Sequence, residues 1–275
     1  MSDNYDSVLK SKMSESSFAK LTALKNPKVM EFIGFFAQHC DPKSIFVGTD
    51  SAEDIDYVRK QAIAKGEEEV LANSEQTIHW DGYGDQARDK ENTRFMVYKE
   101  NLESMKALNS IEYDKGYEEI MSISKGIMKG KDVVVLFFSE GPTESVFTIP
   151  CVQFTDSWYV AHSELILYRS AYTHFLKMPE AEKARFYRFI HSAGELDERG
   201  CTVNLDKRRI YMDTQNNIVY SMNDQYAGNS IGLKKHAMRL AINQAGKEGW
   251  LCEHMFVMAA VDAEKGRNTY LCGAY

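Results

Sequence analysis

Two adjacent lysines at the start of a predicted helix have the clearest chemical potential in this sequence. They end a glycine-bearing segment, YAGNSIGLKK, at residues 226–235. The N-terminus of a helix is its positive pole, so cations there are unfavourable by up to about 1 kcal/mol. Lys234 and Lys235 therefore make sense beside a bound anion, which free backbone N–H groups would also contact. The alternative is a solvated lysine pair on an exposed helix.

A phosphate-binding loop for a nucleoside triphosphate would need the pattern G-x-x-x-x-G-K-[ST]. Gly228 and Gly232 are only four positions apart, and Leu233 separates the second glycine from the lysines. No other segment of the chain fits the pattern. The sequence therefore predicts an anion site in a chain that has no recognisable nucleotide-binding residues.

Two further residues could take part in such a site. His254 opens the predicted strand that follows the lysine helix, and imidazole is a common ligand of divalent metals such as manganese, iron or zinc. Arg88 lies in a charged loop, and its guanidinium fork matches a carboxylate in two parallel hydrogen bonds. The alternatives are a structural histidine and an exposed arginine paired with a neighbouring aspartate.

The pattern of apolar residues predicts an α/β fold, in which a mixed sheet is flanked by helices. The run Val133–Phe138 is continuously apolar, which predicts a central strand buried on both faces. The other predicted strands are 44–48, 95–98, 152–159, 210–212, 218–221, 255–261 and 269–272, with a hairpin turn at 215–217. Helices are predicted within the first 40 residues and at 51–64, 113–129, 163–178 and 231–247, and residues 72–94 are predicted to form a loop.

Composition excludes several classes of protein. The net charge of −7 and a hydrophobic fraction of 44% are typical of a water-soluble globular protein, without a bias toward nucleic acid or anionic membranes. No apolar run approaches the roughly 20 residues that span a bilayer, and the N-terminus is too polar for a secretory signal. Five scattered cysteines without a CxxC pair indicate reduced thiols and a cytoplasmic location.

Several motifs together resemble the phosphoenolpyruvate carboxykinases, and in particular their GTP-dependent branch. FSEGP at 138–142 and VQFTDSWYV at 152–160 resemble the family's FSMGP and VQLTDSAYV. RFIHSAG at 188–194 resembles its LHSVG stretch, and GNS, KK and EGWLCEHM between 228 and 255 resemble GNSLLGKK and EGWLAEHM. These motifs occur in the family's order over roughly residues 80–275, whereas residues 1–70 match only loosely.

The resemblance implies roles for individual residues. Lys235 and His254 would bind the catalytic manganese, or magnesium in its place, and Lys234 would contact the transferring phosphate or carboxylate. Arg88 would bind the substrate carboxylate, while Tyr226, Gly228 and Asn229 would line the substrate pocket. The family interconverts oxaloacetate and phosphoenolpyruvate plus carbon dioxide, a reaction of gluconeogenesis.

The resemblance also implies an N-terminal, substrate-binding domain over residues 1–275. GTP would be the co-substrate of the complete enzyme, and a C-terminal nucleotide-binding domain would begin just beyond Tyr275. Leu233 stands where the GTP branch has a glycine, so a pyrophosphate-dependent carboxykinase is an alternative. A non-catalytic anion-binding module that uses the same lysine helix is another. A fragment that lacks the nucleotide half is expected to be inactive alone.

Overall fold

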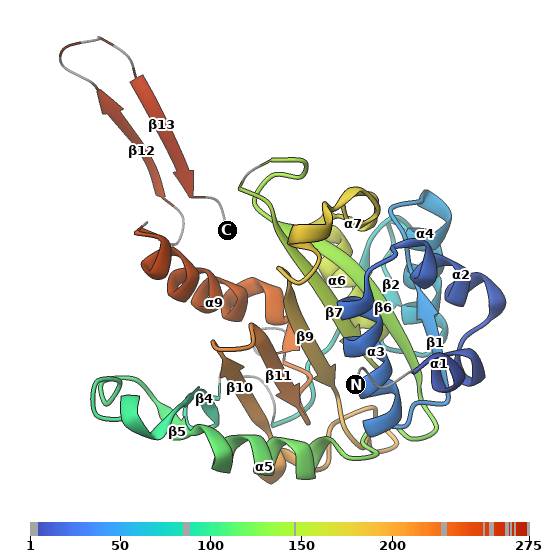
Figure 1. Ribbon diagram of the computed structural model, residues 1–275. Coiled ribbons are helices and arrows are strands. Elements are labelled where there is room, and N and C mark those ends of the chain that lie inside the picture. Colours follow the sequence, from blue (N-terminus) through green and yellow to red (C-terminus); the bar gives the residue numbers. More distant parts are fainter. Residues whose placement is uncertain are drawn as a thin grey trace.

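A mixed β-sheet organises the chain (Figure 1). The computed structural model describes residues 5–84, 89–145, 147–226, 230–249, 251–252, 256–261, 264, 266 and 268–273, without the side chains of 233–235, 256–261 and 268–273. Within these residues the main sheet has nine strands. In spatial order they are β1 (Ser44–Val47), β6 (Asp132–Glu140), β7 (Ile149–Thr155), β9 (Tyr187–Ser192), β11 (Ile218–Met222), β10 (Arg209–Asp213), β4 (Thr93–Val97) and β5 (Ser110–Glu112), with β8 (Arg169–Ser170) paired to β6.

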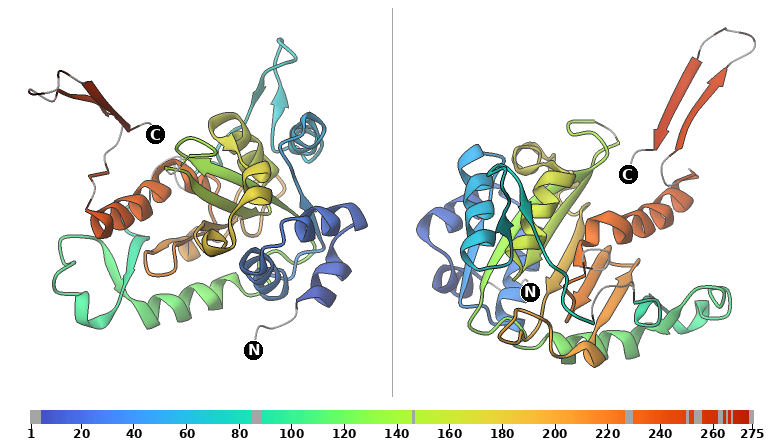
Figure 2. Two further views of the ribbon diagram at one scale, coloured as in Figure 1. Left: turned by 45° about the horizontal axis from the view of Figure 1, so that its top comes forward. Right: turned by 180° about the vertical axis from the view of Figure 1, so that it is seen from behind.

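Two short hairpins lie outside the main sheet. The first pairs β2 (Glu69–Val70) with β3 (Thr77–Ile78), and the second pairs β12 (Phe256–Val261) with β13 (Asn268–Gly273). The β12–β13 hairpin extends away from the body of the molecule (Figures 1 and 2). The strands predicted at 255–261 and 269–272 are therefore present, and they pair with each other.

The directions of three neighbouring strands create one polar edge of the sheet. Strand β7 is parallel to β9, and β9 is parallel to β11, so all three end on the same side. The register aligns Thr155 with His191 and Ser192 with Met222. We call this side the strand-end edge and define it by Thr155, Ser192 and Met222. Strands β6 and β10 begin at the same edge, because β6 is antiparallel to β7 and β10 is antiparallel to β11. Strand β4 also begins there, because it is parallel to β10.

Helices cover both faces of the sheet (Figure 2). One face packs against α1 (Asp6–Lys12), α2 (Glu15–Ala23), α3 (Pro27–His39), α5 (Tyr113–Ser124) and α7 (Tyr172–Lys177). The other packs against α4 (Ala52–Ala64), α6 (Trp158–Leu167) and α9 (Gly232–Glu248). Single 3₁₀ turns occur at η1 (Lys99–Asn101), η2 (Glu180–Glu182) and η3 (Leu205–Lys207).

Strand β6 shows why the sheet needs both layers. Val133, Val135 and Phe137 join the core on the first face, whereas Val134, Leu136 and Phe138 join the core on the second. All six side chains are buried. The predicted strand with two buried faces is therefore confirmed, and it is paired on both sides, by β1 and β7. It lies next to the β1 edge of the sheet, away from the middle.

Several predicted boundaries are wrong for local reasons. The strand predicted over 152–159 ends at Thr155, because the Ser157 side chain accepts a hydrogen bond from the Val160 N–H and starts α6. The helix predicted over 163–178 is two helices, since β8 interrupts it by pairing with β6. The helix predicted to reach residue 129 ends at Ser124, where Lys125 is already extended. Strand β9 was not predicted.

Other predictions are confirmed. Strands β10 and β11 form the expected hairpin, and α9 ends at Gly249 in the left-handed region. Ser51 caps α4 at the start of the helix predicted over 51–64, whereas Asp50 accepts hydrogen bonds from the backbone N–H groups of Tyr172 and Thr173 and so caps α7. Cys40, Cys151 and Cys201 form no disulfide bond, and Cys40 and Cys151 are buried. None of the described helices has the length and apolar character of a bilayer-spanning segment.

Two phenylalanines, Phe138 on β6 and Phe147 between β6 and β7, test the packing of β6. Phe138 is 0% exposed and Phe147 is 62% exposed. Phe138→Ala should lower the free energy of unfolding by about 3–5 kcal/mol, because it leaves a cavity between the sheet and the α6 layer. Phe147→Ala should change it by less than about 1 kcal/mol. Urea unfolding of both variants measures the difference, and equal losses would contradict the two-faced core.

Candidate functional site

Three polar segments meet at the strand-end edge. Thr155-Asp156-Ser157 begins with the last residue of β7, and residues 192–194 begin with the last residue of β9. Residues 223–226 follow β11 and lead to Tyr226, the first residue of the predicted anion loop. Because the three strands are parallel neighbours, their carboxyl ends bring these segments together. Ligand sites of open α/β sheets commonly lie outside such strand ends.

The carboxylate of Asp156 links the first two segments. Its Oδ2 accepts hydrogen bonds from the Lys131 ammonium at 2.8 Å and from the Ser192 hydroxyl at 2.5 Å. Its Oδ1 accepts from the Ala193 N–H at 2.9 Å. The Asp156 side chain is 0% exposed, so these three donors replace water around a buried charge. The Lys131 ammonium also donates to the Gly194 carbonyl at 2.5 Å, which fixes the turn after β9.

Gly194 permits a close approach between this turn and the loop after β11. Its φ is +72°, in the left-handed region that favours glycine. A Cβ at this position would lie 2.1 Å from the Asn223 Oδ1, which is far inside van der Waals contact. The turn after β9 therefore packs directly on the residue that begins the segment leading to Tyr226.

His191 links all three segments through its two ring nitrogens. Its Nδ1 lies 2.7 Å from the Thr155 hydroxyl, and its Nε2 lies 2.8 Å from the Asp224 carbonyl oxygen. A carbonyl can only accept, so Nε2 carries the proton, and in the neutral ring Nδ1 accepts from the Thr155 hydroxyl. All three residues are buried. The backbone that precedes Tyr226 is thus held by β7 and β9 as well as by β11.

Tyr226 is tied to the start of α9. Its carbonyl oxygen accepts from the Ser230 N–H at 2.9 Å and from the Ser230 hydroxyl at 3.1 Å. Gln225, one residue earlier, accepts from the Thr202 N–H at 2.7 Å and from the Thr202 hydroxyl at 2.9 Å. The loop that carries the predicted substrate residues therefore has a fixed entry and a fixed exit.

Helix α9 starts without a side-chain cap. Its N-cap position is Ile231, which makes no side-chain hydrogen bond to the first turn. The first N–H groups of an α-helix have no partner within the helix, so an uncapped start suits an anion. Gly232 allows this start to pack closely, because a Cβ there would lie 2.8 Å from the ring of Phe189 on β9. The sequence places Lys234 and Lys235 in this first turn.

The residues on either side of 85–88 lie at the same edge. On one side, a Cβ on Gly82 would lie 3.4 Å from the Gln225 Oε1, so this flank adjoins the residue before Tyr226. On the other side, the Asp89 carboxylate accepts from the Arg208 Nε at 2.9 Å and from the Asn92 side chain at 2.9 Å. Burial alone would raise the pKa of Asp89, but these donors outweigh it and lower that pKa.

The described residues include only part of the predicted site. Tyr226 lies at the strand-end edge, and the backbone of Lys234 and Lys235 lies in the first turn of α9. Arg88, Gly228, Asn229 and His254 lie outside the described residues, as do the side chains of both lysines. At about 1.5 Å per residue, α9 ends about 20 Å from its lysines. A site shared with His254 therefore requires the chain after Gly249 to return along the helix.

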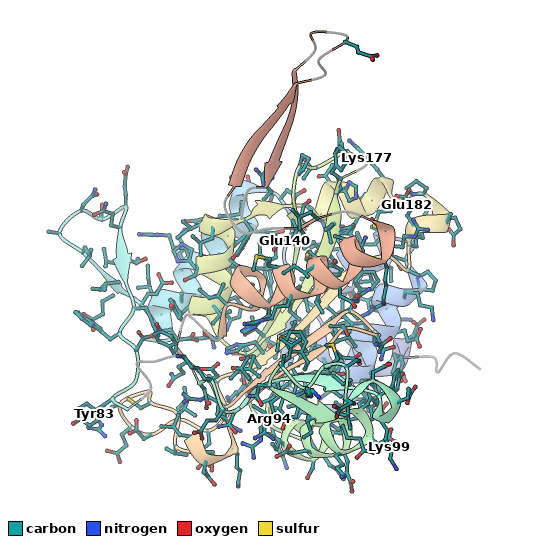
Figure 3. All side chains as sticks on the ribbon, turned by 90° about the vertical axis from the view of Figure 1, so that its left-hand side faces the viewer. Tyr83, Arg94, Lys99, Glu140, Lys177 and Glu182 are labelled. Carbon is teal, nitrogen blue, oxygen red and sulfur yellow. The ribbon has the colours of Figure 1, made fainter. Side chains whose placement is uncertain are left out.

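The opposite end of the sheet has a different electrostatic character. Figure 3 shows Tyr83 and Arg94 in the lower part of the view and Glu140 above them. Glu140 ends β6, and its Oε1 is buried without a hydrogen-bond partner among the described residues. Burial raises the pKa of Glu140 to about 7, although Arg169 partly offsets this effect. This isolated carboxyl lies far from the three polar segments and is not part of the candidate site.

Comparison with known proteins shows which family the chain belongs to. The family model described as phosphoenolpyruvate carboxykinase N-terminal domain matches residues 31–246. The chain belongs to this family. It is 50% identical over 263 residues to a protein of Thermococcus kodakarensis named phosphoenolpyruvate carboxykinase [GTP], covering 96% of this chain and 41% of that protein. Proteins of the same name from Pyrococcus horikoshii and Saccharolobus solfataricus are 49% and 42% identical over 97% and 90% of the chain.

The chain therefore spans about two-fifths of the length of those relatives. They cover it almost completely, whereas it matches 41%, 42% and 38% of their own lengths. The family match extends through the first turns of α9, which include the lysine pair. The predicted membership and the predicted mixed α/β fold are both confirmed.

Sequence reasoning did not find the residues that support the carboxykinase loop. Asp156 and His191 occur in motifs that established the resemblance, but neither received a role. Lys131 and Arg208 gave no signal that separates them from other basic residues. The signal that could have identified Asp156 and His191 is their position at the ends of buried strands. A buried strand that ends in Thr-Asp-Ser or His-Ser presents polar side chains at the edge of a sheet.

Two aspartate–lysine pairs test the importance of the buried carboxylate. Asp156 with Lys131 and Asp132 with Lys65 both have N–O distances of 2.8 Å, but the aspartates are 0% and 32% exposed. Asp156→Asn should lower the free energy of unfolding by about 3 kcal/mol, because it leaves a partly buried ammonium without its counter-charge. Asp132→Asn should cost less than about 1 kcal/mol. Urea unfolding at neutral pH measures both, and a smaller loss for Asp156→Asn would contradict this view of the edge.

Proposed function

We propose that this chain is the substrate-binding part of a GTP-dependent phosphoenolpyruvate carboxykinase. The complete enzyme would interconvert oxaloacetate and phosphoenolpyruvate plus carbon dioxide, as a carboxy-lyase of gluconeogenesis in the cytoplasm. The observation that carries this proposal is the convergence of three features at the strand-end edge. These are the Tyr226 loop, the uncapped start of α9 with its two lysines, and the anchored flanks of the Arg88 segment.

The proposed substrate site recognises a small dianion. Arg88 would hold a carboxylate of oxaloacetate or phosphoenolpyruvate through its guanidinium fork. Tyr226, Gly228 and Asn229 would line the pocket around the carbon skeleton. Lys234 and the free N–H groups of the α9 start would stabilise the negative charge that develops when the carboxylate leaves and the enolate is phosphorylated. Preorganised donors of this kind act without reorganising during the reaction.

Manganese, or magnesium in its place, is the proposed cofactor. Lys235 and His254 would hold it, and a lysine can do so only through its neutral amine. These two nitrogens are the ligands that we propose from this chain. When bound, the metal would supply Lewis-acid stabilisation of the enolate and phosphate oxygens.

GTP is the proposed phosphoryl donor, because relatives that match nearly the whole chain carry GTP in their names. This observation favours GTP over pyrophosphate, although Leu233 replaces the glycine expected before the lysines. The nucleotide would bind to a separate C-terminal domain, which is the main protein partner that we propose. Nucleic acid and membranes have no part in this proposal.

The carboxylate role of Arg88 can be tested in a carboxykinase that contains this chain as its N-terminal part. Arg88→Lys keeps the charge but loses the two parallel hydrogen bonds, so kcat/KM for oxaloacetate should fall by roughly 10- to 100-fold. Steady-state kinetics with GTP and manganese give the value. Arg94→Lys, six residues away on β4, is the matched control and should retain activity within about twofold.

Two outcomes of this experiment would contradict the proposal. An Arg88→Lys enzyme with wild-type kcat/KM would remove Arg88 from the substrate site. A wild-type enzyme that uses pyrophosphate but not GTP would refute the proposed donor while leaving the carboxylate site intact.

The metal role can be tested by manganese titration followed by electron paramagnetic resonance in the same enzyme. Lys235→Met and His254→Ala should each weaken manganese binding by about tenfold or more, because each removes a coordinating nitrogen. Lys247→Met, in the last turn of α9, removes a lysine from the same helix and should leave the affinity unchanged. Wild-type affinity in the first two variants would exclude these residues as ligands.

A further inference from the structure

A cavity adjoins the strand-end edge on the side of α5. It has a volume of about 430 Å³ and lies between the end of α5, the turn after β9 and the loop that precedes β10. Its polar lining consists of Lys129, Lys131, Lys207, Asn204, Asn223 and Glu195. Three ammonium groups face one carboxylate there, so the cavity has a local excess of positive charge in a chain whose net charge is −7.

Within the described part of the chain, Lys131 is the one ammonium group of the three that forms an ion pair, although Lys129 lies near enough to the Asp41 carboxylate to help lower its pKa. Lys131 is paired with Asp156, but no hydrogen bond or ion pair is made by the side chains of Lys129 and Lys207. Glu195 accepts a hydrogen bond from the Asn204 side chain at 3.3 Å. Unpaired lysines that line one concave surface are attracted to an anion, and the attraction is strongest where the walls exclude water.

The remaining donors fit an oxyanion. The side-chain amide of Asn223 gives one N–H to the Lys207 carbonyl at 3.2 Å, and that of Asn204 gives one to Glu195. An amide nitrogen carries two hydrogens, so each residue keeps one donor. No arginine occurs in the lining of this cavity among the described residues. Lysine acts as a point charge that suits phosphate, whereas the planar recognition of a carboxylate favours arginine.

The other wall of the cavity is apolar. Ile123 and Ile127 from the end of α5 face Leu196 from the turn after β9. This wall suits the carbon skeleton of a small metabolite. We infer that the cavity is a binding site for a small organic phosphate, separate from the proposed substrate site.

The inferred phosphate site lies next to the residues that fix the start of the proposed substrate loop at Tyr226. Asn223 is buried, has a φ of +57°, and packs against Gly194 three residues before Tyr226. Lys131 contributes to the cavity and also holds Asp156 and the Gly194 carbonyl. A bound phosphate thus contacts the residues that fix the start of this loop.

Nuclear magnetic resonance titration of the ¹⁵N-labelled chain with glycerol 3-phosphate tests the inference. The titration uses an Arg88→Ala background, which removes the proposed substrate site and so separates the two proposals. The side-chain amide signals of Asn204 and Asn223 should shift with saturation. Lys129→Gln combined with Lys207→Gln should weaken binding by at least about tenfold, because two charge-assisted contacts are lost.

Lys125→Gln is the matched control. Lys125 is exposed, lies four residues before Lys129 and does not line the cavity, so its replacement should change the affinity by less than about twofold. Glycerol without phosphate should produce no shift. The inference is overturned if the two asparagine amides do not respond to glycerol 3-phosphate, or if the double variant binds it with the affinity of the parent chain.

Discussion

The buried carboxylate of Asp156 is the interaction on which the strand-end edge depends. A charge with no solvent contact is costly unless donors surround it, and Asp156 has three. One comes from the start of β6 and two come from the end of β9, while the aspartate itself follows β7. One carboxylate thus joins three strands at the point where each meets the surface. If it were lost, the turn at Gly194 and the packing of Asn223 against it would lose their common support.

In the proposed function the loop that begins at Tyr226 recognises the substrate, and this support would hold it in place. Loops usually move more than the strands they connect, whereas a binding site must hold its donors in place. Here the backbone before Tyr226 is fixed by His191, and the backbone after it is fixed by Ser230. The uncapped start of α9 follows shortly after in the sequence, at Ile231. In the proposed function, this arrangement would place hydrogen-bond donors beside the negative charges of oxaloacetate and phosphoenolpyruvate.

The sequence predicted those parts of the fold that depend on local patterns. The apolar run of β6 predicted a strand buried on both faces, and the turn at 215–217 predicted the β10–β11 hairpin. Strand β9 was missed because Arg188, His191 and Ser192 break its apolar pattern, and His191 and Ser192 find their side-chain partners on other strands. The start of α6 was misplaced because its aromatic residues favour a strand. The hydrogen bond that the Ser157 side chain accepts from the Val160 N–H favours a helix instead.

The residues of the candidate site likewise fall into those that the sequence indicates and those that only the fold reveals. Lys234 and Lys235 could be suspected from sequence, since cations at a helix start are unusual, and the family resemblance gave a role to Arg88. The supporting residues could not be found, because their roles depend on the register that aligns Thr155 with His191. That register is known only once the two strands are paired in the folded chain. The membership of the family, by contrast, followed from short motifs that are specific only in combination.

The central claim is that substrate recognition takes place at the strand-end edge. Titration of the ¹⁵N-labelled chain with oxaloacetate, followed by backbone amide shifts, tests it most directly. The account predicts the largest shifts at Gln225, Tyr226 and Asp89, which flank the proposed pocket. Glu140 and its neighbours at the opposite end of the sheet should not respond. Shifts confined to the Glu140 end, with none at Tyr226 or Asp89, would contradict the account.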